Sequence, residues 1–418
     1  MKNKTNFDLI VIGAGAAGMM AAIIAARRGK DVLLLEKLPT IGSKLKATGG
    51  GRCNLTNTLS NETFMARFGR EGRFMMPSLE SFSHQSLIDF FTEIGVQSHS
   101  PDGYRVFPLT HNSSTIITAL EEEMKKCDIQ LLCSQKVERL EHDGQKIDGV
   151  STKEHTYHAP HVIIATGGLG FPSLGAEGDG FLLASNLGHT ITELYPAMIP
   201  LHVKEKWVQN CRADTIAKAE LRINLPKAKQ LRAIGDLIFT NHGIRGPVVL
   251  DFAREITPLL EKHHEVPLLI NLTKGRNEDQ ILSHLKNEIL KNPEFSTLTH
   301  LTSLLPESVA REICTLAEVD PKMRFSKLSG LQRNCLIKLL AWTPLTIIGH
   351  DGFKMAMITR GGVSLKEISP DTMESKLIKG LFFCGEVMNL DGPCGGFNLQ
   401  WSFSSGYLAG HLGEVSER

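Results

Sequence analysis

The first 36 residues contain the pattern that most constrains how this chain can fold. An apolar run at 7–12 precedes Gly-Ala-Gly-Ala-Ala-Gly at 13–18, an alanine-rich segment that ends near Arg28, and a second apolar run at 31–35. Short β-branched runs are typical of buried parallel strands, and alanine-rich sequence favours a helix. The order predicts a β-α-β unit of a Rossmann-type α/β fold.

Three glycines and one glutamate in this unit predict a bound dinucleotide. Gly13 would allow a tight turn, Gly15 would let the backbone approach a pyrophosphate, and Gly18 would let helix and strand pack closely. The helix N-terminus would direct free N–H groups and a positive dipole end at phosphates. Glu36 ends the second strand, where a carboxylate can accept hydrogen bonds from both ribose hydroxyls, and its charge disfavours the 2′-phosphate of NADP. We therefore expect an adenine dinucleotide.

Further glycine-rich segments favour FAD over NAD. The second strand leads into a cationic loop, 42–54, in which Lys44 and Arg52 can neutralise phosphates. Another strand ends at the turn 166–168, and a strand, an acid and a Gly-Gly turn follow one another within 380–400. FAD has an extended pyrophosphate–ribitol–flavin axis that needs a second site opposite the first, which NAD does not. An NAD-only dehydrogenase stays open as an alternative in which the C-terminal segment is structural.

Motifs spread over the whole chain resemble one family of bacterial flavoproteins. The sequence is similar to the BaiN-like, or aminoacetone oxidase-like, NAD(P)/FAD-dependent oxidoreductases. The motifs that carry the resemblance are Thr-Gly-Gly-Gly-Arg-Cys-Asn-Leu-Thr-Asn at 48–57, Gly-Asp-Gly at 178–180 with Leu-Gly-His at 187–189, the segments 239–247 and 361–375, and Gly-Gly-Phe-Asn-Leu-Gln-Trp at 395–401. The chain departs from the family at Asn389, where Asp is usual, and at 241–245, where the family usually has His-x-Gly-x-Ser. The second departure weakens any catalytic role carried over for that loop.

The motifs and the resemblance together give a set of expected FAD-binding residues. They lie in the β-α-β unit, the cationic loop, two strand ends and the C-terminal turn. The set is Gly13, Gly15, Ala16, Ala17, Gly18, Glu36, Lys37, Lys44, Gly50, Gly51, Arg52, Cys53, Asn54, Val137, Thr166, Gly167, Gly168, Gly385, Glu386, Asp391, Gly395, Gly396, Asn398 and Leu399. Val137 is included because a valine at the start of the corresponding strand contacts adenine in related flavoproteins; a plain hairpin strand is the alternative there.

The resemblance also implies a domain organisation. We expect a Rossmann-type FAD-binding domain built from both chain ends, with its parts at 1–195 and 346–418. Between them we expect an inserted β-rich subdomain at 196–275 and a helical subdomain at 276–345. The sequence agrees independently, because strand-like runs give way to helical spacing of apolar residues within the insert.

Local patterns predict individual elements within these parts. Runs typical of strands lie at 219–224, 236–240 and 266–271. The residues 135–150 are typical of a β-hairpin. Small residues at 404–410 indicate the start of a helix that packs closely against a neighbour.

The charge and the cysteine content limit the kinds of partner that the chain is expected to have. The chain has 46 Lys and Arg against 45 Asp and Glu, and this near balance argues against a nucleic acid as its main partner. Eight dispersed cysteines without a CxxC pair or zinc spacing are typical of reduced cytosolic thiols, and no metal is expected. The expected partner is a small-molecule substrate, and the oligomeric state stays open.

One apolar run needs a separate interpretation. Residues 9–26 carry no charge and could pass for a signal peptide or a membrane span. Asp8 directly before the run, three glycines within it and Arg27 and Arg28 after it argue against both. We therefore expect a cytoplasmic protein without a membrane role.

Few residues suggest catalysis, since the flavin itself would carry the redox step. Cys53 in the glycine loop and His242 on a turn of the insert are weak catalytic candidates, each more simply explained as structural. His189 is expected to end a helix, where a cation suits the helix dipole. No second GxGxxG is found, so NAD(P)H would bind only transiently as electron donor, or the substrate would reduce the flavin.

Together these observations predict a FAD-dependent oxidoreductase. It would transfer hydride through the flavin to or from a small organic substrate, with NAD(P)H as a candidate donor. Two alternatives stay open: a flavin-dependent RNA-modifying enzyme, because related folds act on tRNA, and a non-catalytic protein that uses FAD for binding or redox sensing. The sequence does not distinguish a reductase from an oxidase.

Overall fold

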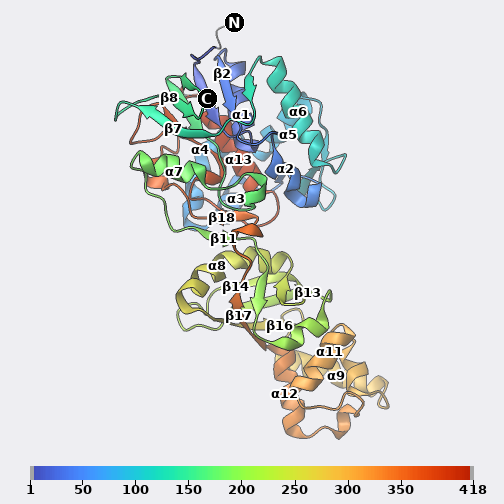
Figure 1. Cartoon of the computed structure of the whole chain (residues 1–418). Coiled ribbons are helices and arrows are strands. Elements are labelled where there is room, and N and C mark those ends of the chain that lie inside the picture. The colour runs from blue at the N-terminus through green and yellow to red at the C-terminus, as the bar shows by residue number, and fades with distance from the viewer. Residues whose placement is uncertain (1–3, 415–418) are drawn as a thin grey trace. The chain divides into compact units, whose positions relative to one another are not determined.

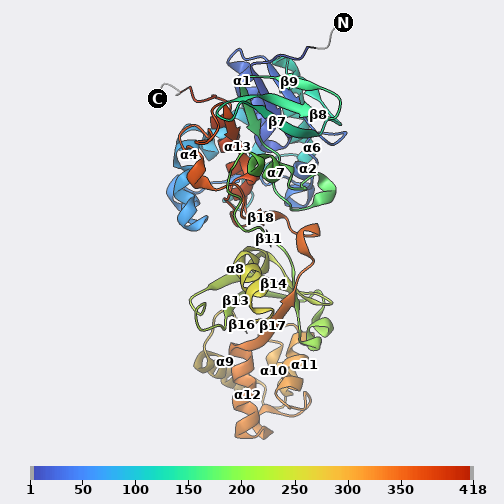
Figure 2. The same ribbon diagram turned by 60° about the vertical axis from the view of Figure 1, so that its left-hand side comes forward.

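The computed structural model of the chain describes residues 4–414 and divides into two compact units. The first unit is Met1–Pro196 with Met357–Arg418, and the second is Ala197–Ala356. Each unit has its own cluster of buried apolar side chains. In Figures 1 and 2 the first unit therefore contains both the blue and the red parts of the ribbon.

A five-stranded parallel sheet forms the centre of the first unit. Its strand order is β19-β10-β1-β2-β6. The strands are β1 Leu9–Ile12, β2 Val32–Leu35, β6 Gln130–Leu132, β10 His161–Ile164 and β19 Leu381–Phe383. Because β19 comes from the C-terminal part and pairs with β10, the predicted Rossmann-type domain built from both chain ends is confirmed.

Two helices from opposite chain ends pack on each other beside this sheet. They are α1, Ala16–Arg27, and α13, Phe397–Ala409, drawn in blue and red in Figure 1. A Cβ atom added to Gly406 would lie 2.4 Å from the Ala17 carbonyl oxygen, so the backbones touch here. The expected close packing is present, but the expected helix start near 404 is wrong. The helix begins at Phe397, because Gly396 in a left-handed conformation ends the preceding turn.

The apolar run at 9–26 is divided between β1, a glycine turn and α1. Within residues 4–414 no helix is both long and apolar enough to cross a bilayer.

Smaller sheets and helices complete the first unit. The hairpin predicted at 135–150 is confirmed by the antiparallel pairing of β7 with β8. The further strands are β3 Thr56–Asn57, β4 Ser98–His99, β5 Arg105–Pro108, β7 Val137–His142, β8 Ile147–Thr152, β9 Thr156–His158, β11 Tyr195–Ala197 and β18 Ile358–Arg360. The further helices are α2 Ser43–Ala47, α3 Asn61–Ala66, α4 Met76–Ser81, α5 His84–Glu93, α6 Ser113–Lys126 and α7 Asp179–Asn186.

The second unit contains a closed barrel and a group of helices. The barrel order is β12-β15-β14-β13-β16-β17. Its strands are β12 Leu201–Val203, β13 Thr215–Ile223, β14 Arg232–Phe239, β15 Gly243–Arg245, β16 Val266–Asn271 and β17 Thr343–Gly349. The helices are α8 Pro247–His263, α9 Glu278–Lys291, α10 Thr297–Leu301, α11 Glu307–Leu316 and α12 Gly330–Ala341.

The long helix α8 lies within residues 196–275, for which the sequence predicts a β-rich subdomain. Pro247 occupies the first turn of α8, where its missing N–H costs nothing. Val248, Val249, Phe252 and Ile256 then repeat at helical spacing and are buried. This periodicity distinguishes α8 from the strands around it.

Candidate functional site

The glycine turn between β1 and α1 shows why each of its glycines is needed. Gly13 has φ of 100°, and a Cβ there would lie 2.7 Å from the Ala165 oxygen at the end of β10. A Cβ on Gly18 would lie 1.9 Å from the Gly13 oxygen, so helix and strand pack through this residue. A Cβ on Gly15 would meet nothing within 4 Å, and no side chain caps α1. The N-terminus of α1, with Ala16 and Ala17, is therefore open to a phosphate group.

Glu36 lies at the end of β2 and is held by the backbone. Its Oε2 accepts a hydrogen bond from the Ala14 N–H at 2.8 Å, and its Oε1 accepts one from the Leu38 N–H at 2.9 Å. Each carboxylate oxygen keeps a second lone pair. The backbone thus orients the carboxylate and leaves each oxygen able to accept one more hydrogen bond, as binding of ribose hydroxyl groups would require. The carbonyl of Glu36 accepts from the Gln135 N–H, two residues before Val137.

Lys37 takes part in an ion-pair network beside this strand end. Its Nζ contacts Asp179 at the start of α7 and Glu177 at 2.7 Å, and Lys136 reaches Asp179 at 2.8 Å. Burial alone would raise the pKa of Asp179, but the two lysines outweigh it and lower the pKa. In this arrangement Lys37 joins α7 to β2, and its predicted contact with the cofactor stays a prediction.

The loop after α2 has an unusual backbone. Gly49, Gly50 and Gly51 all have φ between 58° and 86°, a left-handed conformation that favours glycine. A Cβ on Gly50 or Gly51 would meet nothing within 4 Å. The Arg52 Nε donates to the Gly49 oxygen at 3.2 Å, and its guanidinium lies 5.6 Å from the Phe107 ring centre. The loop leaves two backbone positions open to a ligand.

This loop is joined to the C-terminal glycine turn, although more than 330 residues separate them. With its amide oriented to satisfy both ends, Asn54 accepts from the Gly396 N–H at 3.0 Å. Asn57 Nδ2 donates to the Gly395 oxygen at 2.9 Å. A Cβ on Gly396 would lie 2.4 Å from Thr56 backbone atoms. The structure therefore brings the two glycine-rich segments together, as a cofactor that uses both would need.

The C-terminal turn is braced from within. Asn398 Oδ1 accepts from the Gly392 N–H at 2.8 Å, and its Nδ2 donates to the Gly392 oxygen at 2.9 Å. Asp391 before this turn is buried, and Leu399 is half-buried in α13. Asn398 is thus a structural brace of the turn, and a contact of its own with FAD stays a prediction.

A second long-range link joins the cationic loop to the last strand. Lys44 Nζ lies 2.7 Å from Glu386 Oε2, and Glu386 Oε1 accepts from the Thr359 N–H at 2.9 Å. A Cβ on Gly168 would lie 2.4 Å from Thr359 Oγ1 and 2.8 Å from Glu386 Oε1. The side chains of Lys44 and Glu386 are only about a quarter and a sixth exposed. The two predicted residues are therefore neighbours, with Gly168 beside them.

Two further turn residues lie close to this link. Gly385 has φ of 77°, and a Cβ there would lie 2.9 Å from the Ala17 side chain. A Cβ on Gly167 would meet nothing within 4 Å, while the buried hydroxyl of Thr166 has no hydrogen-bond partner in the structure. An open glycine next to an unsatisfied hydroxyl fits a site that is completed by a ligand.

The two weak catalytic candidates lie in different units. The Cys53 thiol is fully buried, and burial raises its pKa to about 12, so it stays protonated at neutral pH. This argues against a thiolate role. His242 lies in the second unit on an exposed turn before β15, where its N–H donates to Thr240 Oγ1 at 3.4 Å. Its catalytic role stays a prediction.

The expected role of His189 as a cation at a helix end is wrong. The residue follows α7 and is buried, with Nε2 2.9 Å from Ser375 Oγ and Nδ1 3.3 Å from Glu367 Oε2. Burial lowers its pKa despite the nearby carboxylate, so the ring is neutral at pH 7. It therefore joins segments of the first unit and does not serve a helix dipole.

Sequence reasoning missed two residues that hold the predicted site together. Thr359 has no motif of its own, yet its Oγ1 accepts from the Leu169 N–H at 2.7 Å and its N–H binds Glu386. Thr56 belongs to a family motif that predicts no role for it, although its backbone supports Gly396. A threonine in a short strand carries no periodic signal that would have marked Thr359.

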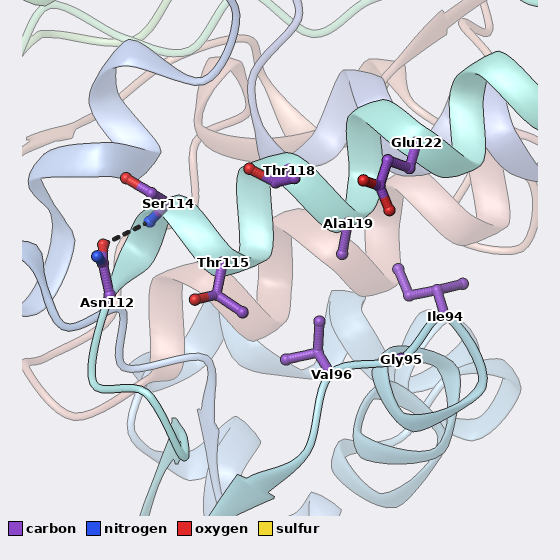
Figure 3. Close-up of a pocket in the computed structure, with 9 residues that line it drawn as sticks. All are labelled: Ile94, Gly95, Val96, Asn112, Ser114, Thr115, Thr118, Ala119 and Glu122. Carbon is purple, nitrogen blue, oxygen red and sulfur yellow. Dashed lines mark hydrogen bonds between the residues drawn. The ribbon is translucent and has the colours of Figure 1, made fainter.

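An open hollow lies elsewhere in the first unit, between the end of α5 and one face of α6 (Figure 3). Its volume is about 430 Å³, and its lining includes Val96, Thr115, Thr118 and Glu122. None of the predicted FAD residues lines it. The hollow is therefore separate from the candidate cofactor site.

The geometry defines a class of protein. A helix N-terminus without a side-chain cap, an oriented carboxylate after β2, and two joined glycine-rich turns, the first of which is open at Gly50 and Gly51, fit an extended dinucleotide. The first unit is a Rossmann-type FAD-binding domain.

Comparison with known proteins gives the family. Residues 7–412 match the family described as HI0933-like protein Rossmann domain, and the chain belongs to it. It is 31% identical to a 3-dehydro-bile acid delta(4,6)-reductase of Clostridium scindens, over 96% of this chain and 97% of that protein. It is 29% identical to a ribosomal RNA dihydrouridine synthase of Haemophilus influenzae, over 95% and 96% of the two chains. The predicted resemblance to BaiN-like flavoproteins is confirmed.

Solved structures agree on the fold. A 3-ketosteroid delta1-dehydrogenase from Sterolibacterium denitrificans superposes with a TM-score of 0.53 at 12% identity, covering 98% of this chain and 99% of that one. This likeness concerns the fold alone. The family and the full-length relative identify the chain as an oxidoreductase with FAD as its cofactor. The predicted enzyme class and cofactor are confirmed.

Proposed function

We propose that this enzyme reduces a carbon–carbon double bond conjugated to a carbonyl group in a small organic molecule. The observation that carries the proposal is the 31% identity to a bile acid reductase over nearly the full length of both chains. Reduction of such a bond adds a hydride to the carbon far from the carbonyl and a proton to the carbon next to it.

The relatives that act on ribosomal RNA fit the same chemistry. A dihydrouridine synthase, by its name, forms dihydrouridine, and this product arises when the C5–C6 double bond of uracil, conjugated to a carbonyl, takes up two hydrogens. One reaction type therefore covers both kinds of relative. The substrates differ greatly in size and charge, so substrate binding must distinguish them.

Residues of this chain from several elements would hold the cofactor. Glu36 would accept the ribose hydroxyls, and the N-terminus of α1 would bind the pyrophosphate. The joined turns with Gly50, Gly51 and Gly395 would fix the other half. When bound, FAD supplies the hydride chemistry. NAD(P)H is the proposed electron donor, binding transiently, since no second GxGxxG occurs in the sequence.

The test examines the electron donor and the substrate in two successive steps. The purified flavoprotein is mixed without oxygen with NADH or NADPH, and the flavin absorbance is followed. Bleaching is expected with at least one of them. A 3-oxo-4,6-diene steroid acid is then added, and restored absorbance together with the reduced product is expected. Bleached flavin that no conjugated ketone reoxidises would contradict the proposal.

An RNA substrate is the weaker second candidate, and one observation favours it. The net charge of the whole chain is close to zero, but the two units differ in net charge. Residues 197–356 carry 22 Lys and Arg against 17 Asp and Glu, and the remaining residues carry 24 against 28. A net positive charge on one unit suits a phosphate backbone. Ribosomal RNA binding that weakens steeply with salt, with dihydrouridine formed in the RNA, would favour this candidate over the small molecule.

We also infer a cytoplasmic location. The eight cysteines are all free, as expected where thiols stay reduced. Fractionation of cells that produce the protein would test this inference, with recovery in the membrane or exported fraction as the contrary result.

A further inference from the structure

Two histidines of the first unit meet at the protein surface, in a place that the cofactor site does not use. His99 lies in β4 and His111 in the turn after β5. Their Nε2 atoms are 2.8 Å apart, and their ring planes are 84° apart. No group of three or more His, Cys, Asp or Glu side chains suited to a metal occurs among residues 4–414. A two-histidine site would therefore take its other ligands from water.

The surroundings hold the backbone of both residues and the ring of His111. His99 is opposite Phe107 in the β4–β5 ladder. His111 has φ of 49°, its N–H donates to the Pro108 oxygen at 2.9 Å, and its ring lies 5.7 Å from the Phe107 ring. The Leu109 N–H ties the same turn to the Gln97 oxygen at 2.9 Å. Because the two backbone segments and the His111 ring are held in place, binding of one ligand by both nitrogens needs only the His99 ring to be ordered further.

The geometry of the pair resembles two ligands of one metal ion. With metal–nitrogen bonds of about 2.1 Å, two imidazoles at a right angle place their nitrogens about 3.0 Å apart, and at a tetrahedral angle about 3.4 Å apart. The observed 2.8 Å is closer to the right angle. The ring centres are 4.6 Å apart, less than the roughly 5 Å of a head-on hydrogen bond, so the two rings are not collinear.

The local charge also permits a cation. Arg105 is the cationic side chain of β5, but its Nε lies 2.7 Å from Asp102 Oδ2. Arg52 and Arg105 both lie over the Phe107 ring, at 5.6 Å and 5.9 Å from its centre. The charge of Arg105 thus lies at Asp102 and at the phenyl ring, and that of Arg52 lies at the same ring.

We propose that His99 and His111 form a binding site for a divalent transition metal ion that prefers right-angled nitrogen ligands, Cu²⁺ or Ni²⁺. These ions favour tetragonal coordination with imidazole, and water would complete the coordination at this exposed position. Bound metal would clamp β4 to the turn 108–111. Because Phe107 lies between this turn and Arg52, the clamp is next to the glycine loop of the cofactor site.

The test uses the full flavin-loaded chain without a histidine tag. Cu²⁺ is titrated by calorimetry, and the bound ion is examined by electron paramagnetic resonance. One ion per chain is expected, with hyperfine structure from two nitrogens. His99→Ala and His111→Ala should each weaken binding at least about tenfold, the loss that even an outer-shell partner causes. His142→Ala, at another exposed histidine, is the matched control and should bind as the parent does.

Folding is checked separately, because a weakened fold could also lose metal. Flavin content and melting temperature without metal should be the same in all variants. Addition of Ni²⁺ should raise the melting temperature of the parent and of His142→Ala only. Unchanged Cu²⁺ affinity in the variant lacking both His99 and His111, or a single nitrogen ligand in the parent spectrum, would overturn the proposal.

Discussion

At the residue scale, Glu36 carries the most specific prediction about the cofactor. Glu36→Arg places a cation where the carboxylate is held by the N–H groups of Ala14 and Leu38. Both backbone donors lose their acceptor, and the ribose hydroxyls of the proposed site would lose theirs. We expect purified Glu36→Arg to contain no FAD by absorbance. Glu138→Arg, at an exposed position of β7, is the control and should keep its flavin; equal flavin in both variants would refute the ribose assignment.

Cysteine reactivity gives a second test at this scale. Cys53 is buried with a pKa of about 12, whereas Cys335 is exposed. The thiolate is the reactive form, so a thiol reagent should modify Cys335 quickly and leave Cys53 unmodified in the folded protein. Peptide mass analysis after brief labelling measures both. Rapid labelling of Cys53, or loss of flavin reduction in Cys53→Ala, would restore the thiol as a catalytic candidate.

His189 predicts how stability depends on pH. Its pKa is lowered by burial in the folded state and returns to about 6.5 on unfolding, so the unfolded chain binds more protons between these two values. The contribution of His189 is fully present above about pH 6.5 and is lost as the pH falls toward the lowered value. His189→Gln should therefore show a smaller drop in melting temperature from pH 7.5 to 5.5 than the parent. An equal drop would mean that His189 is not the titrating group.

The same residues show what a sequence can predict at this scale. Gly18 and Glu36 are predictable because each role depends on neighbours within about thirty positions, and Gly13 is predictable because its turn needs a positive φ. The link between Lys44 and Glu386 is not predictable in this way, because the partners are 342 positions apart and meet only after β19 joins the sheet. His189 was misjudged for a similar reason, since its burial depends on Glu367 and Ser375.

At the element scale, the contact between α1 and α13 makes a clear prediction. Gly406→Ala would place a methyl group 2.4 Å from the Ala17 oxygen, so the helices must separate. Overpacking of this kind costs about 1–3 kcal/mol of unfolding free energy. We expect a lower melting temperature and less bound flavin, because α1 also starts at the glycine turn. Chemical denaturation with flavin absorbance measures both effects.

A matched glycine provides the control. Gly330 begins α12, has no positive φ, and a Cβ there would meet nothing within 4 Å. Gly330→Ala should leave stability unchanged or raise it by up to about 1 kcal/mol, since alanine favours a helix. If Gly406→Ala were as harmless as Gly330→Ala, the inferred close packing of α1 and α13 would be refuted.

The types of the elements follow from the periodicity of apolar residues, as for α9 and α12. The start of α13 does not, because it depends on a left-handed glycine at 396.

At the scale of the whole molecule, the chain order and the spatial order differ. The sheet and buried cluster of the first unit need both chain ends, because β19 pairs with β10 and α13 packs on α1. The family resemblance implies this organisation, and the change from strand-like to helical runs within the insert agrees with it. Local runs predict strands and helices, but strand order in a parallel sheet depends on which distant segments meet.

This difference leads to a prediction about dissection of the chain. The buried cluster of the second unit comes wholly from within residues 197–356, and its barrel closes on itself without a strand from outside. A fragment of these residues should therefore unfold cooperatively on its own, as judged by thermal melting followed by circular dichroism. The fragment 1–196, which lacks β19 and α13, should neither fold stably nor bind FAD.

A variant without the second unit tests whether the first unit holds FAD by itself. The strands that lead out of it and back, β11 and β18, pair with each other, so a short glycine-rich linker can replace 198–356 without stretching the chain. This variant should retain FAD, because all the predicted cofactor residues lie outside the removed segment. It should lose reduction of the conjugated ketone if the second unit supplies substrate contacts. A linker variant without flavin would show instead that the second unit is needed to form the cofactor site.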